Sequence, residues 1–134
     1  MSWTCPICQK TYGKANQSHY CYASDLHELL RENEQLIALY QQLLARLEVE
    51  GEFIVRLSAK AITLAERVGF AVIYGKRDSL DIGIMLPDEW PEFPVYKVQQ
   101  RSKHKYVNWV RIYDEDDLNP QVFALLRGAR EAAR

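Results

Sequence analysis

All three cysteines of this 134-residue chain lie within its first 21 positions, and their spacing limits how the N-terminal segment can fold. Cys5 and Cys8 form a Cys-x-x-Cys pair, whose two thiolates can face one metal ion from a tight turn. Cys21 supplies a third thiolate, and either His19 or His27 supplies the fourth ligand. The pattern predicts a structural zinc site, because four protein ligands leave no position open for a reacting water.

A redox-active Cys-x-x-Cys motif is the alternative interpretation of this segment. A thioredoxin-like motif follows a strand and opens a helix, whereas only four residues precede Cys5. The N-terminus has no basic region followed by an apolar core, and no apolar run is long enough to span a membrane. We therefore expect a cytoplasmic protein without a membrane partner, in which reduced cysteines favour metal over disulfide.

The segment from 24 to 51 predicts helix, with a break near Asn33 between a short first helix and a longer second one. Its apolar face comprises Leu36, Leu39, Tyr40, Leu43, Leu44 and Leu47. We expect a last helix to open at Asp116 or Asp117 and to bury a second apolar stripe. That stripe comprises Val122, Leu125, Leu126 and Ala129.

Between these helices the hydrophobic period changes to two, which indicates strands. The strand-like runs are 53–57, 61–65, 69–75, 80–87, 95–100 and 106–113. The sequence therefore predicts an α+β fold in which a mostly antiparallel sheet of about six strands has flanking helices packed on one face. We expect two parts, a zinc-binding module at 1–24 and an α+β domain at 25–134.

Two sets of motifs resemble known proteins. "WTCPICQKTY" and "NQSHYC" resemble a short zinc module of bacterial proteins with the pattern CPxC and NQxHxC. The stretches "VRLSAKAITLAERVGFAVIYGKRDSLDIGIMLP" and "SKHKYVNWVRIYDEDDLN" resemble the domain-of-unknown-function family 5655. Because the histidine of Asn-Gln-x-His belongs to that zinc motif, the resemblance implies Cys5, Cys8, His19 and Cys21 as the ligands, with His27 in reserve. It implies no reaction.

The charge pattern of the last two strands favours a binding role. A net charge of −1 and a pI of about 6.3 do not indicate a protein that is cationic overall, so nucleic-acid binding needs a local patch. From 95 to 113 the charged side chains are all basic, and aromatic residues lie among them. Cations contact phosphates and aromatic rings stack on bases, so this segment indicates DNA or RNA as a partner. The candidate binding residues are Lys60, Lys97, Arg101, Lys103, Lys105, Arg111 and Trp109.

Other functions stay open at this stage. The chain has no nucleophile-elbow motif and no glycine-rich phosphate loop, so we expect it not to be an enzyme. Trp3, Trp90 and Phe93 fall in loop or terminal positions, where aromatic side chains often anchor protein interfaces. A protein-interaction adaptor is therefore one alternative. A protein that handles small anions or metals is another, since Lys60 can attract an anion and the family resembles a wider set of small α+β domains, some of them linked to iron handling.

Replacing one thiolate tests the zinc module. We expect Cys8→Ala and His19→Ala to lower the zinc content well below one ion per chain, because metal binding supplies the folding free energy of such modules. The measurement is elemental analysis of the purified variants. His27→Ala is the matched control and is expected to keep its zinc. Full zinc occupancy in Cys8→Ala would contradict the ligand set.

Overall fold

The computed structural model describes residues 2–4, 11–13 and 26–134. In the N-terminal segment, β1 (Trp3–Thr4) pairs antiparallel with β2 (Thr11–Tyr12). The hydroxyl groups of Thr4 and Thr11 lie 3.1 Å apart across this pair. The predicted division into a module at 1–24 and a domain at 25–134 depends on residues that lie largely outside the described part.

The predicted break in the first helical segment is confirmed. Helix α1 (Leu26–Leu29) is separated from α2 (Glu34–Glu48) by a turn in which Arg31 and Glu32 have φ angles of 57° and 54°. Asn33 caps α2, because its side-chain oxygen accepts hydrogen bonds from the amides of Gln35 and Leu36. An asparagine at this position satisfies amides that have no partner within the helix.

Six strands form one antiparallel sheet in the order β3-β4-β5-β6-β8-β7. The strands are β3 (Ile54–Leu57), β4 (Ile62–Ala65), β5 (Gly69–Gly75), β6 (Leu80–Leu86), β7 (Lys97–Ser102) and β8 (Lys105–Ile112). Consecutive strands are neighbours except at one place, where β8 lies between β6 and β7. The predicted α+β class and the six-stranded antiparallel sheet are therefore confirmed.

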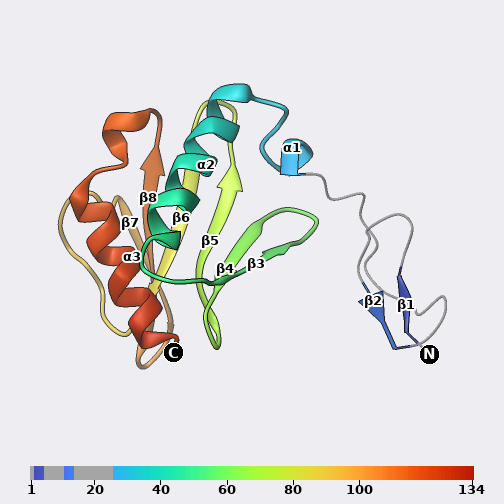
Figure 1. The fold of residues 1–134 in the computed structure, drawn as a ribbon. Coiled ribbons are helices and arrows are strands. Elements are labelled where there is room, and N and C mark those ends of the chain that lie inside the picture. The colour runs from blue at the N-terminus through green and yellow to red at the C-terminus, as the bar shows by residue number, and fades with distance from the viewer. Residues whose placement is uncertain (1, 5–10, 14–25) are drawn as a thin grey trace.

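One face of the sheet packs against α2 and α3 (Pro120–Ala132), which lie together on the same side of the strands (Figure 1). Alternate residues of each strand reach this face, as the pleat of a strand requires. The buried residues there include Ile62, Leu64, Ile73, Leu80, Ile82, Ile84, Val110 and Ile112. The helices contribute the predicted apolar stripes, and Ile37 joins that of α2.

The last helix begins later than the sequence suggested. Asp116 and Asp117, the two predicted first residues, do not open this helix. They belong to a short 3₁₀ helix, η1 (Glu115–Asp117), which Asp114 caps. Helix α3 starts at Pro120, and the side chain of Asn119 accepts a hydrogen bond from the Val122 amide. The prediction was wrong because the acidic run satisfies its own backbone amides in a separate turn.

A buried asparagine holds the loop between β6 and β7. Asn108 of β8 is fully buried, accepts a hydrogen bond of 2.7 Å from the Trp90 amide and donates one of 3.3 Å to the carbonyl of Asp88. Both ends of this amide therefore bond to loop backbone. The burial of the polar side chain is compensated, and the loop is fixed over the helix-side face of the sheet.

Arg130 joins α3 to the rest of the core although it carries a charge. The residue is only 1% exposed, and its guanidinium donates to the carbonyls of Leu47, Gly51 and Glu52 and to the carboxylate of Glu66, at 2.7–3.2 Å. The carboxylate compensates the buried charge, and the three carbonyls lie at the end of α2 and just after it. This one side chain therefore links α3, the C-terminal end of α2 and the segment after β4.

Removing this guanidinium tests its structural role. Arg130→Met is expected to lower the free energy of unfolding by roughly 3–5 kcal/mol, because the Glu66 carboxylate keeps only the exposed Arg134, at 3.7 Å, and the carbonyls lose their charged donor. Urea denaturation followed by circular dichroism measures the change. Arg127→Met is the control in the same helix. Arg127 forms an exposed pair with Glu50 at 3.4 Å, so its loss should cost less than about 1 kcal/mol. Equal losses in the two variants would contradict the role of Arg130.

Candidate functional site on the open sheet face

The face of the sheet opposite α2 and α3 is not covered by any helix that the structure describes. We call it the open face. The strand register places one row of residues across its middle: Arg56, Thr63, Val72, Gly83, Trp109 and Lys97. The row has cations at both ends and a large aromatic ring between them, so it combines the side chains that bind phosphates and bases.

The Trp109 ring is held in place by its neighbours on this face. Its indole nitrogen donates a 2.9 Å hydrogen bond to the Gln99 side chain, and its ring centroid lies 5.9 Å from that of Tyr74. Gly83 lies beneath it. A Cβ there would come within 3.1 Å of the indole and within 2.8 Å of the Val107 side chain, so glycine is needed for the ring to pack onto the sheet.

A second cluster lies two residues farther along the strands. The Tyr96 hydroxyl donates a 2.6 Å hydrogen bond to the carboxylate of Asp81, which is 8% exposed. The Arg111 guanidinium lies over the Tyr96 ring at 4.3 Å, and its Nε is 4.0 Å from Asp81. The carboxylate therefore has two partners, while the guanidinium stays partly exposed at the end of β8.

This cluster shifts the ionisation of its members. Burial raises the pKa of the Tyr96 phenol, and the hydrogen bond to Asp81 and the charge of that carboxylate raise it further. The hydroxyl groups of Tyr113 and Tyr96 raise the pKa of Arg111. The phenol therefore stays neutral and donates its proton to Asp81, and the guanidinium stays charged, at any pH near neutrality.

The structure brings together some of the predicted binding residues. Lys97, Trp109 and Arg111 share the open face, whereas Arg101 is exposed where the pairing of β7 with β8 becomes irregular. Lys103 lies in the exposed turn between these strands. Lys60 does not join them. It lies in the turn between β3 and β4, which is at the opposite edge of the sheet from β7 and at the other end of the strands from Lys103.

Sequence reasoning included Tyr96 among the aromatic residues of the basic segment but missed Asp81 and Gly83 as parts of this face. The strand run "LDIGIML" contained a signal, because an aspartate and a glycine at alternate positions of an apolar strand point to one face with special contacts. No signal in the sequence joined Asp81 to Tyr96. Their contact depends on β8 lying between β6 and β7.

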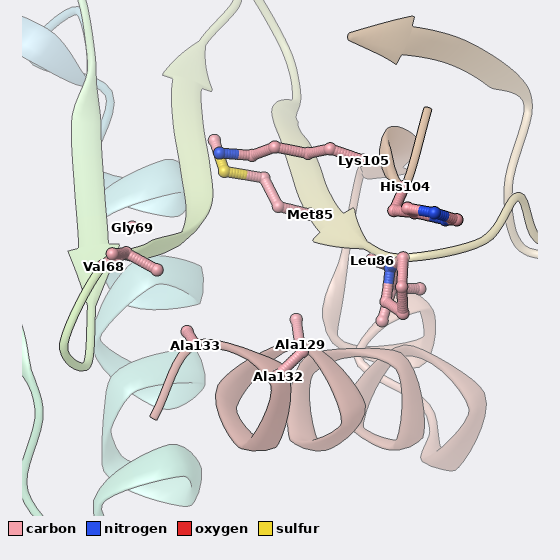
Figure 2. A pocket seen from close by; sticks show the side chains of 10 residues that line it. Val68, Gly69, Met85, Leu86, His104, Lys105, Ala129, Ala132 and Ala133 are labelled. Carbon is pink, nitrogen blue, oxygen red and sulfur yellow. The ribbon is translucent and has the colours of Figure 1, made fainter. Parts of the chain in front are cut away.

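Two of the hollows beside α3 also border β6 and the loop that follows it. One, of about 220 Å³, lies between the start of β5, the end of β6 and the end of α3 (Figure 2). Lys105 and Met85 extend side by side toward it, while the His104 ring points away from the other labelled side chains. The other, of about 550 Å³, is an apolar groove between α3 and the loop after β6, with Trp90, Pro91, Leu125 and Gly128 in its lining.

The side chains that are predicted to hold zinc lie outside the described residues. Cys5, Cys8, His19 and Cys21 are in this group, and for His27 the structure gives only its backbone position in α1. Within residues 2–4, 11–13 and 26–134, no three His, Cys, Asp or Glu side chains come together in a way that suits a metal ion.

The pKa of the Tyr96 phenol tests the contact between Tyr96 and Asp81. We expect Asp81→Asn to lower the pKa of Tyr96 toward its ordinary value, because the amide removes the negative charge that favours the neutral phenol. An NMR pH titration of ¹³C-labelled tyrosine rings measures it. Asp78→Asn, a change in the exposed turn before β6, is the control and should leave this pKa unchanged. An unaltered pKa in Asp81→Asn would contradict the contact.

The family model described as "Domain of unknown function (DUF5655)" matches residues 26–132, which is most of the chain and all of the six-stranded sheet. No curated protein and no solved structure matches the chain. None of the described helices is both long and apolar enough to cross a bilayer. The chain belongs to the DUF5655 family of domains of unknown function.

Proposed function

We propose that this protein is a non-catalytic binding module that contacts nucleic acid through the open face of its sheet. One observation carries the proposal. Lys97, Trp109 and Arg111 lie on this face, and the acid that accompanies them, Asp81, is already engaged by Tyr96 and Arg111. A polyanion that approaches this face meets exposed cations beside an aromatic ring.

The charge distribution along the chain supports this assignment. The net charge is −1, yet the two strands β7 and β8 and the turn between them carry only basic charges. Arg56 adds a cation at the far end of the middle row. The positive charge is therefore local, as a specific contact with phosphate requires in a protein that is not basic overall.

The N-terminal segment supplies the second part of the proposal. Cys5, Cys8, His19 and Cys21 hold a structural zinc ion, and the module braces the chain ahead of the sheet domain or adds a further contact to the ligand. The ligand set follows from the spacing of the thiolates and from the resemblance to the CPxC and NQxHxC motif. The reduced thiols that the site needs favour the cytoplasm as its location.

A protein partner is the second candidate, and the apolar groove beside α3 favours it. Trp90 at its edge is 41% exposed, and Phe93 in the same loop is 73% exposed. Large aromatic side chains in exposed loops are typical anchors of protein interfaces. Binding there would leave the open face unused, so substitutions on the two faces separate the two functions.

The test is fluorescence anisotropy with labelled single-stranded DNA, duplex DNA and RNA at several salt concentrations. We expect affinity for at least one of them to fall steeply with salt, and Lys97→Glu/Arg111→Glu to weaken binding by roughly tenfold or more because phosphate contacts are lost. The control is Lys60→Glu/Arg127→Glu, which changes the net charge equally but away from the open face. No binding at low salt, or equal loss in both variants, would contradict the proposal.

A further inference from the structure

The arrangement around Trp109 indicates which class of nucleic acid the open face binds, single-stranded or duplex; this inference rests on the proposed function. We infer that the open face binds single-stranded nucleic acid, with an unpaired base stacked on Trp109 and the neighbouring phosphates held by Lys97 and Arg111. Among the residues that the structure describes, Trp109 is the only tryptophan in the six-stranded sheet, since Trp90 lies in the loop after β6 and Trp3 in β1.

Trp109 is already fixed in one orientation before any ligand arrives. The hydrogen bond from its indole to Gln99 uses the one polar atom of the ring, and the packing against Gly83 and Tyr74 restricts its rotation. Gln99, Gly83 and Tyr74 all belong to strands of this sheet. When a base stacks on this ring, the nucleic acid loses conformational freedom but the Trp109 side chain loses little. The smaller entropy cost favours binding.

Cations lie on two sides of this ring. Lys97 is directly opposite Trp109 in the pairing of β7 with β8, and Arg111 is two residues along β8 on the same face, about 7 Å away by strand geometry. Arg111 is positioned by Tyr96 and Asp81, at 4.3 Å and 4.0 Å. One stacked base thus has a charged side chain near each of its flanking phosphates.

The sheet topology argues against duplex DNA. A two-stranded ribbon can enter the major groove, and β7 with β8 forms such a hairpin. Here, however, β8 is also paired with β6 along its length, so the ribbon is part of a wide sheet and only the Lys103–His104 turn extends beyond it. The bases of a duplex are stacked on one another and cannot lie on Trp109 without leaving the helix.

A variant with a single tryptophan tests the inference. In Trp3→Phe/Trp90→Phe, all tryptophan emission comes from Trp109, and titration with unlabelled oligothymidylate or oligouridylate should quench it by half or more. The same titration with a duplex of equal length should quench it far less. In anisotropy, Trp109→Leu should weaken single-strand binding by tenfold or more, whereas Trp109→Phe, which keeps an aromatic ring, should lose less than fivefold.

The outcomes separate the inference from the proposed function. Salt-dependent binding that is equal for duplex and single strand, or that leaves Trp109 emission unchanged, overturns the stacking inference and leaves the phosphate-binding proposal standing. Absence of salt-dependent binding to every nucleic acid overturns both. The quenching experiment keeps Trp109 in place, so it decides the matter even if Trp109→Leu does not fold. Trp90→Leu, on the other side of the sheet, is the matched control and should bind as the parent does.

Discussion

The guanidinium of Arg130 is the interaction on which the arrangement of the domain depends. It lies where the end of α2, the following segment and the residue after β4 meet, and it donates to backbone carbonyls and to Glu66. The rings of Phe53 and Phe70 lie 5.0 Å and 5.9 Å from its central carbon. This charge ties α3 to the end of α2 on the side of the sheet where both helices bury their apolar stripes, opposite the open face.

The two faces of the sheet follow different chemistry for this reason. The helix-side face is built from aliphatic side chains, with Asn108 as the polar exception that the loop satisfies. The open face mixes aromatic, basic and acidic groups, and its burial is partial. Gly83 belongs to a strand that contributes to both faces. Its lack of a side chain lets Trp109 approach the sheet, and the strand that contains it still delivers Ile82 and Ile84 to the core.

Local signals predicted the elements of the fold well, because they depend on near neighbours in the chain. Asn33 marked the helix break through its capping side chain, and the period of two marked all six strands. The sequence did not reveal that Arg130 is buried, because a lone arginine in a helix is usually solvated. The contact of Asp81 with Tyr96 and the separation of Lys60 from Lys97 both follow from the strand order, which adjacent residues do not encode.

The way in which Asn108 holds its loop has a consequence for how the protein can change over evolution. The asparagine bonds only to main-chain atoms, at Trp90 and Asp88, and so it does not depend on which side chains those positions carry. Homologous chains that keep the asparagine can therefore diversify Asp88, Glu89 and Trp90 while the loop retains its path. Side chains in this loop can therefore change the surface of the protein while the backbone of the loop keeps its conformation beside the sheet.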